Sequence, residues 1–183
     1  MKNRIGGLSG LALFLLLACS GPEAPTQERI PSAAEMKDSL EHLAGLLEEA
    51  NGDVIDLQDT ARALVTLSKD FVSKFPDDEN AASILFRAAD VARGLREYGQ
   101  AIELWGKVWR SYSDYERAPD ALFLQGFTFD ADLRDAANAQ KYYQLFLQKF
   151  PEHPLAAQAE QLLQVVSEQP EELIKKFQSG EAQ

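Results

Sequence analysis

The sequence predicts an all-α protein built as a solenoid of antiparallel helix pairs. Three short junctions, each an aromatic residue, a turn residue and an acid, recur at residues 75–77, 112–114 and 150–152, with spacings of 37 and 38 residues. Helix-spaced positions repeat with the junctions: Ala81, Leu85, Phe86 and Ala89 correspond to Ala118, Leu122, Phe123 and Gly126. No segment alternates between apolar and polar residues as a strand does. A period in this range indicates a solenoid, whose usual work is to hold other molecules.

The first helix pair is predicted from a cap, a turn and two apolar stripes. Ser32 and Glu35 have the spacing of a capping box, so a helix is expected to begin there and to run to about Ala50. Residues 51–53, Asn-Gly-Asp, form a turn because Asn and Gly tolerate positive φ. A stripe of apolar residues at helical spacing from 57 to 75 then predicts the second helix.

The remaining helices follow the same pattern. We expect residues 81–93 to pair with 100–112 across a break at Gly94 and a turn at Tyr98-Gly99. The third pair joins 119–130 to 136–150, with Pro119 one residue inside its helix, where its missing N–H costs nothing. A final helix over 155–167 precedes one more short helix that Pro170 opens.

The N-terminal residues 1–18 have the layout of a secretory signal peptide. Lys2 and Arg4 precede an apolar run over 11–17, which is too short to span a bilayer as a helix. The run ends in Leu-Leu-Ala-Cys and resembles the lipobox of bacterial lipoproteins, in which the cysteine is acylated and becomes the first mature residue. That resemblance implies lipidation of Cys19, the chain's one cysteine. An ordinary signal peptide followed by an unrelated cysteine is the alternative.

The rest of the chain divides into a tether and one domain. Residues 19–32 are a polar, Pro-containing stretch, predicted to be a lipidated flexible tether. Residues 33–183 suit a single helical repeat domain. Ser20 follows the acylated position where an aspartate would, by resemblance to enterobacterial sorting, favour the inner membrane. The expected location is therefore the bacterial cell envelope, anchored in the outer membrane and facing the periplasm.

The charge of the chain excludes some classes of partner. The formal net charge is −11, and removal of the signal peptide takes away Lys2 and Arg4 but no acid. Nucleic acid and anionic lipid head groups are therefore not expected to bind. A solvated acidic surface, the steering of basic partners and the screening of cations all remain open as explanations.

The helix pairs resemble the tetratricopeptide repeat. In the third pair the resemblance is carried by Leu122, Gly126, Phe129, Ala139, Tyr143 and Pro151. The second pair matches at Leu85, Ala89, Ala101 and Trp105, with Ser113 at the terminal Pro, and the first is degenerate. The resemblance implies a right-handed superhelix of about three pairs plus C-terminal capping helices. It is strongest to the bacterial envelope subset, found in outer-membrane assembly lipoproteins and Tol-Pal-associated proteins; an unrelated helical bundle is the alternative.

The resemblance also implies where a partner binds. In this family the first helix of each pair usually lines the concave, binding surface, so an envelope protein or peptide is the expected partner. The residues at matching positions are Phe86, Asp90 and Arg93 from one repeat and Phe123, Phe127 and Asp130 from the next. If these aromatic rings are exposed they form a patch that needs a partner, and if buried they are core. The alternative function is a structural spacer or oligomerising subunit, with an apolar face around Leu162, Leu163, Val166 and Leu173.

Residues for catalysis or metal binding are not found in a convincing pattern. His42 and His153 lie on different predicted elements, and Asp130, Asp132 and Asp135 lack the glycine and distal glutamate of an EF-hand. Phosphate-binding loops, nucleophile elbows and metalloprotease helices are missing from the sequence. We therefore expect no enzymatic activity, no catalytic or metal site, no cofactor and no small-molecule substrate.

Overall fold

A computed structural model describes residues 29–49 and 54–168 of the chain. The chain divides into two compact units, Met1–Ile30 and Pro31–Gln183, and the helices below belong to the second. The predicted signal peptide, Cys19, the turn at 51–53 and the short helix after Pro170 lie outside the described residues. Within the described ranges, no helix is long and apolar enough to cross a membrane.

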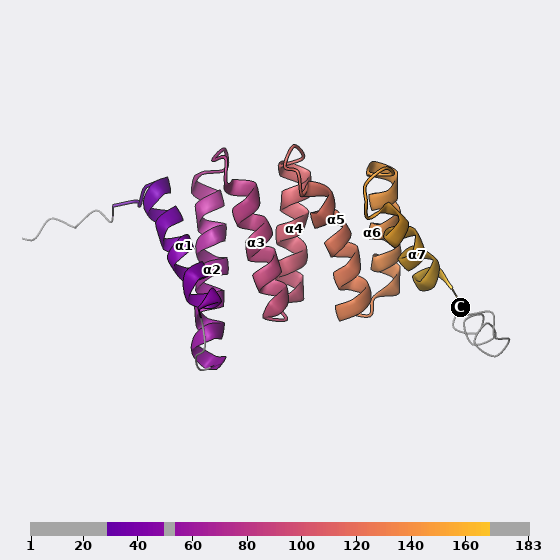
Figure 1. Ribbon diagram of the computed structural model, residues 1–183, viewed down its shortest axis with the longest axis horizontal. Helices are drawn as coiled ribbons and strands as arrows, with labels where there is room; N and C mark the ends of the chain where they lie inside the picture. Colours follow the sequence, from indigo (N-terminus) through magenta and orange to yellow (C-terminus); the bar gives the residue numbers. More distant parts are fainter. Residues whose placement is uncertain (1–28, 50–53, 169–183) are drawn as a thin grey trace, which may run out of the picture. The chain divides into compact units, whose positions relative to one another are not determined.

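The described part of the repeat unit is entirely helical, as predicted. Helices follow one another side by side in chain order, and each packs against the next (Figure 1). They are α1 (Ala33–Glu48), α2 (Val54–Lys74), α3 (Ala81–Gly94), α4 (Tyr98–Ser111), α5 (Ala118–Phe127), the π-helix η1 (Thr128–Asp132), α6 (Ala136–Lys149) and α7 (Ala156–Ser167). This arrangement of adjacent helices is an α-solenoid.

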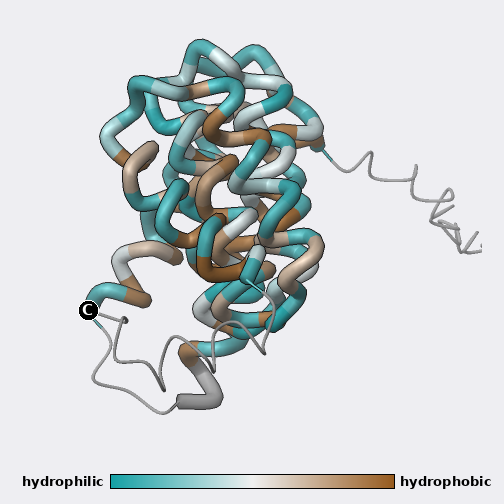
Figure 2. Tube along the Cα trace, turned by 90° about the vertical axis from the view of Figure 1, so that its right-hand side faces the viewer, coloured by the Kyte–Doolittle hydropathy of each residue, from teal (hydrophilic) through white to brown (hydrophobic). Residues whose placement is uncertain are grey.

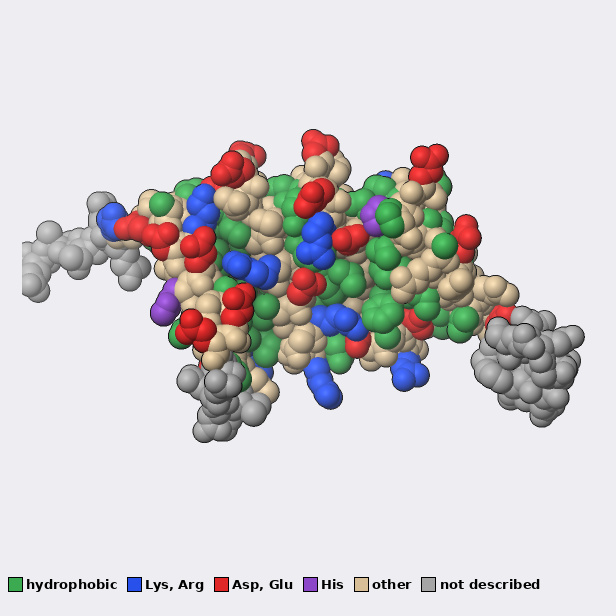
Figure 3. Space-filling model, in the orientation of Figure 1, with side chains coloured by type: hydrophobic (Ala, Val, Ile, Leu, Met, Phe, Trp, Pro, Cys, Tyr) green, Lys and Arg blue, Asp and Glu red, His purple; other side chains and the backbone are tan. Residues whose placement is uncertain are grey.

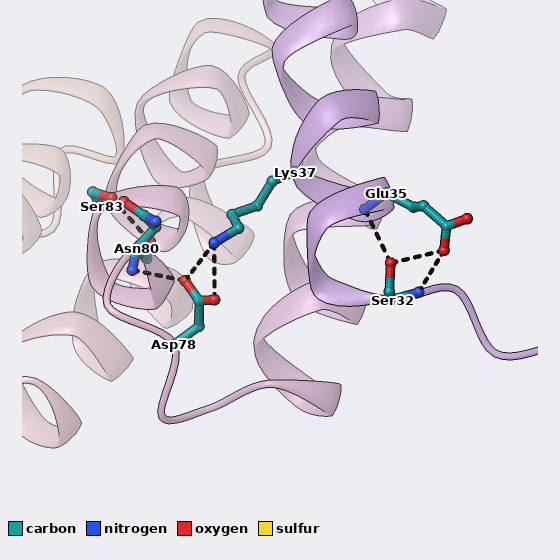
Figure 4. A network of polar contacts seen from close by, with 6 residues as sticks. All are labelled: Ser32, Glu35, Lys37, Asp78, Asn80 and Ser83. Carbon is teal, nitrogen blue, oxygen red and sulfur yellow. Dashed lines mark hydrogen bonds and ion pairs between the residues drawn. The ribbon is translucent and has the colours of Figure 1, made fainter.

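The capping box at the start of α1 is confirmed. The Ser32 backbone N–H donates to Glu35 Oε2 at 2.8 Å, and the Glu35 N–H donates to Ser32 Oγ at 3.3 Å (Figure 4). Pro119 lies in the first turn of α5, also as expected. Local sequence signals therefore fix these two helix starts.

The predicted turn at Tyr98-Gly99 is wrong. Both residues belong to the first turn of α4, and the connection from α3 consists of residues 95–97. Arg96 takes the left-handed conformation at φ 64°, and the Glu97 N–H reaches back to the Ala92 carbonyl at 2.9 Å. Because Arg96 supplies the positive φ that closes α3, no glycine is needed in this turn.

The third pair carries an extra residue in its interhelical turn, and η1 absorbs it. The expected helix to Asp130 instead changes at Thr128 into a π-helix, in which the Leu133 N–H donates to the Thr128 carbonyl at 3.0 Å. Such an i→i+5 bond accommodates an inserted residue without unwinding the helix. Asp135 then caps α6 by accepting from the Asn138 N–H at 3.1 Å.

The core is formed by buried apolar residues of successive helices, and Figure 2 shows the apolar segments mainly towards the middle of the molecule. The large rings expected to fill the repeats, Trp105 and Tyr143, are 0% exposed. A Cβ at Gly126 would lie 3.0 Å from the Tyr143 ring, so the two helices approach each other closely at this position. Ala89, at the corresponding position of the preceding pair, is also fully buried. Small residues opposite large rings thus set the spacing of the helices.

Candidate functional site

The exposed side of α1, α3 and α5, which we call the first-helix surface, contains two grooves. The α1–α3 groove has a volume of about 350 Å³ and includes Lys37 and Glu41 from α1, Arg87 from α3 and Arg117 from the loop before α5. The α3–α5 groove has a volume of about 500 Å³. It is lined by Asp90, Arg93, Gly94, Arg96, Tyr98, Trp105, Leu124 and Asp132. Figure 3 shows acidic and basic side chains interspersed with apolar ones over the helices.

Two of the predicted surface aromatics are buried. Phe86 is 1% exposed, because the Arg117 guanidinium carbon lies 3.8 Å from the centroid of its ring. Phe123 is 5% exposed and packs against Tyr143, with 5.9 Å between ring centroids. Of the two alternatives that the sequence leaves open, the buried one therefore holds for both rings. Phe86 and Phe123 therefore belong to the core beneath the first-helix surface.

Arg93, on α3, packs against the ring of Phe127 at the end of α5. The Arg93 guanidinium carbon lies 5.1 Å from the centroid of the partly buried Phe127 ring. Arg93 Nε also donates to Asp132 Oδ2 at 2.6 Å, which ties α3 to η1. Because this ion pair is also a short hydrogen bond between partly buried groups, it fixes the positions of the guanidinium and the carboxylate. Arg93 therefore lines the α3–α5 groove with its guanidinium already paired, whereas Phe127 packs beside it and lines neither groove.

The two remaining predicted residues have different environments. Asp130 accepts a hydrogen bond from the Tyr143 hydroxyl at 3.2 Å, and burial together with this carboxylate raises the pKa of Tyr143 well above its usual range. Asp90 lines the α3–α5 groove, where partial desolvation of its carboxylate raises its pKa while the positive charge of Arg117 opposes the shift. Asp90 is therefore the acid that faces the groove, while Asp130 serves the core.

A charged contact joins α1 to the junction before α3 (Figure 4). Lys37 Nζ lies 3.0 Å from Asp78 Oδ2, and Asp78 Oδ1 accepts from the Asn80 backbone N–H at 2.9 Å. This backbone hydrogen bond and then Lys37 hold the pKa of Asp78 below its usual range. Arg87, in contrast, has no ion pair or hydrogen bond among the residues that the structure describes. It is the basic group of the α1–α3 groove that is free to meet a partner.

The repeated junctions lie at one end of the helices and are acidic. A third groove of about 770 Å³ there is lined by residues 76–79 and 111–116, which include Asp77, Asp114 and Glu116. The Tyr112 hydroxyl donates to the Pro76 carbonyl at 3.0 Å, linking one junction to the next. The aromatic residue at this repeated position thus holds neighbouring repeats together.

The aspartates that crowd the turn after α5 each have a separate structural partner. Asp130 binds Tyr143, Asp132 binds Arg93, and Asp135 caps α6. Over residues 29–49 and 54–168, no group of three or more His, Cys, Asp or Glu is placed to hold a metal ion. His42 is exposed on α1, whereas His153 lies 3.7 Å from Asp120 and accepts a hydrogen bond from the Leu155 N–H.

Sequence reasoning missed Arg117 and Trp105 as residues of this surface. Arg117 stands in a loop before a helix start, and its position over Phe86 depends on the packing of α3 against the following loop. Trp105 is one of the residues that match the repeat, and it also lines the α3–α5 groove. No local spacing in the chain identifies either role.

The tetratricopeptide repeat family model matches residues 120–153, which cover most of α5, η1 and α6. Residues 120–153 are therefore similar to a tetratricopeptide repeat, and the described helices form an α-solenoid like those of that family. No curated protein matches the chain in a sequence comparison. Repeats of this family typically form non-catalytic modules that bind other proteins or peptides.

Proposed function

We propose that this protein is a lipid-anchored scaffold of the bacterial cell envelope that binds another protein or peptide on its first-helix surface. The observation that carries the proposal is the presence of two open grooves on this surface, in a chain with a tetratricopeptide repeat. Extended surfaces of stacked repeats are the usual binding sites of solenoids. Arg87 and Asp90, both exposed on α3, supply one free charge of each sign.

The anchor in this proposal is the acylated Cys19. Each buried methylene contributes about 0.8 kcal/mol, so the several acyl chains of a bacterial lipoprotein give an effectively permanent attachment. Residues 20–32 then tether the domain to the membrane, and Ser20 favours the outer membrane and the periplasmic side. The function needs no catalytic residue, cofactor or small-molecule substrate.

Site-specific photo-crosslinking in living cells tests the proposal. A photoreactive residue replaces Arg87 in the α1–α3 groove, and the control replaces Lys107, an exposed basic residue on α4. Adducts to one envelope protein from position 87, with none from 107, are expected. Adducts from 107 alone, or to a second copy of the chain, would contradict binding at the first-helix surface.

A second candidate function is that of a structural spacer that oligomerises. It is favoured by α7, the last described helix, where Val165 is 58% exposed and Leu162, Leu163 and Val166 are partly exposed. Leu173, the fourth residue predicted for this face, lies outside the described residues. Sedimentation of the purified protein distinguishes the two functions: the spacer requires a concentration-dependent dimer that Val165→Glu abolishes.

A further inference from the structure

Two arginines occupy the same strained backbone position in successive repeats. Residues 95–97, which join α3 to α4, are Leu-Arg-Glu, and residues 133–135, which precede α6, are Leu-Arg-Asp. Arg96 has φ 64° and Arg134 has φ 55°, in the left-handed region that glycine adopts at lower cost. Such outliers are common at functional sites. An arginine at both positions therefore points to a use of the side chain that the turn itself does not require.

The side chains of both arginines are exposed and available. Neither guanidinium forms an ion pair or a hydrogen bond within the described part of the chain. The acid that follows each arginine is used inside the fold: Glu97 Oε1 accepts from Arg62 Nε at 2.9 Å, and Asp135 caps α6. We call the end of the helices that carries these two turns the turn end. It presents two free positive charges in a chain of formal net charge −11.

The opposite end of the helices, the junction end, is acidic. It carries residues 75–79 and 112–116, and the groove of about 770 Å³ there has no lysine or arginine in its lining. Four of its acids are exposed and form no ion pair in the described ranges: Asp77, Glu79, Asp114 and Glu116. Tyr112 and Tyr115 add aromatic walls, and a guanidinium group stacks on such rings while it binds carboxylates. Figure 3 shows acidic side chains projecting from this upper end and basic ones from the lower, turn end.

Turns and junctions alternate along the solenoid (Figure 1). Residues 95–97 follow the first junction and precede the second, and residues 133–135 stand between the second and the third. A second copy displaced along the helix axes therefore brings its Arg96 opposite the acidic groove. The same displacement brings its Arg134 opposite the next interval, where Glu152 is exposed. Because one repeat sets the spacing of both ends, the two ends match each other.

We propose that the turn end of one molecule binds the junction end of a second copy of this chain. The Arg96 guanidinium enters the groove between Asp77 and Asp114, and Arg134 lies beside Glu152. Charge complementarity and the shared spacing favour a second copy over an unrelated acidic partner, which would have to reproduce that spacing. The contact is heterologous, so each molecule in a pair keeps one end free and the assembly continues as an open chain.

An exchange of charges between the two ends tests this contact. The turn variant carries Arg96→Glu and Arg134→Glu, and the junction variant carries Asp77→Arg and Asp114→Arg. Sedimentation of the purified full-length proteins measures association. Wild type should associate reversibly as its concentration rises to about 100 μM, and each variant alone should associate at least about tenfold more weakly.

Mixing the variants should restore the contact. The turn variant keeps its acidic junctions and the junction variant keeps its basic turns, so an equal mixture should form a one-to-one pair and stop there. A chain with all four changes has exchanged the charges of its ends and should associate as wild type does. Circular dichroism shows whether each variant is folded.

The matched control reverses two charges elsewhere. It carries Lys69→Glu and Lys107→Glu, at exposed residues of α2 and α4, and should associate as wild type does. The contact would be overturned by a wild type that stays monomeric at about 100 μM. Equal weakening by the control and the turn variant, or a mixture of folded variants that forms no pair, would overturn it as well.

Two readouts separate this contact from the functions proposed above. Val165→Glu should leave it unchanged, and an association that Val165→Glu abolishes would be the α7 dimer of a spacer and would contradict the contact. Position 87 should still capture its partner in the junction variant, because neither change lies in the α1–α3 groove. If position 87 captures its partner while sedimentation shows no association, the contact is wrong and the scaffold stands.

Discussion

The Arg117 guanidinium lies 3.8 Å from the centroid of the Phe86 ring and covers it. This contact covers the Phe86 ring at the base of the α1–α3 groove and places a cation at the edge of that groove. The flat guanidinium suits this position because it stacks on a ring face while its edges stay hydrated. The fold therefore holds Phe86 and Arg117 in place on the first-helix surface before any partner binds.

Replacing Arg117 should destabilise the protein modestly. Arg117→Ala removes the stacking contact with Phe86 and the ion pair with Asp120, together about 1 kcal/mol at a half-exposed site. Urea unfolding followed by circular dichroism measures the change. Arg87→Ala, at an exposed residue of the same groove, is the matched control and should change stability by less than about 0.5 kcal/mol. Equal effects of the two variants would mean that the stacking contributes nothing.

Gly126 should not tolerate a methyl group. A Cβ there would lie 3.0 Å from the Tyr143 ring, which is fully buried and bonded to Asp130 and so has little room to move. Overpacking costs about 1–3 kcal/mol and outweighs the gain of about 1 kcal/mol in helix propensity, so Gly126→Ala should lower the melting temperature. Gly45→Ala, in α1 with nothing within 4 Å of the new atom, should raise it instead. A stabilising Gly126→Ala would refute the close-packing account.

The Asp78 contact makes stability depend on pH. The pKa of Asp78 is lowered from 3.8 by the Asn80 N–H and by Lys37, so the folded chain favours the ionised carboxylate. Its contribution is complete above the unfolded pKa and is lost as the pH falls through the lower, folded value. The stability difference between wild type and Asp78→Asn should therefore be constant from pH 7 to about pH 5 and shrink below about pH 4.

Lys37→Met sharpens this test. It removes the second cause of the lowered Asp78 pKa but leaves the first, so the loss of stability in acid should be smaller than in the wild type and should be complete at a higher pH. Unfolding curves at a series of pH values measure both variants. A wild-type profile that matches Asp78→Asn at every pH would show that the carboxylate contributes nothing.

If Cys19 carries the proposed lipid anchor, its replacement should release the protein from the membrane. Cys19→Ser removes the thiol that the proposed acyl chains require, and no described helix can span the bilayer in their place. Membrane fractionation and incorporation of labelled palmitate measure the change. A Cys19→Ser protein that stays in the membrane fraction would contradict the lipid anchor.

Local and periodic signals in the sequence predicted much of the fold. The cap at Ser32, Pro119 in the first turn of α5 and the aromatic junctions each depend on neighbours in the chain or one repeat away, and all are found as expected. The turn before α4 was misplaced because Arg96 adopted the left-handed conformation usually left to glycine. The π-helix after Phe127 also escaped detection, since an extra residue does not reveal how the backbone will absorb it.

The candidate site was harder to predict than the fold. Helical spacing placed Phe86, Asp90 and Arg93 on one face, but it could not show that Arg117 would cover the first or that Asp132 would bind the third. These contacts depend on distances between helices that are remote in the sequence. The position of Trp105 beside Asp90 has the same origin, because α3 and α4 must pack together before both residues line one groove.

Binding at the first-helix surface is the central claim, and charge reversal tests it most directly. The envelope protein captured from position 87 is purified, and its affinity is measured calorimetrically for wild type, Arg87→Glu and Lys107→Glu. Both variants carry the same charge change, on α3 and α4 respectively. The claim predicts that Arg87→Glu weakens binding by about tenfold, equivalent to 1.4 kcal/mol, while Lys107→Glu leaves it unchanged. Equal weakening by the two variants, or weakening by Lys107→Glu alone, would contradict it.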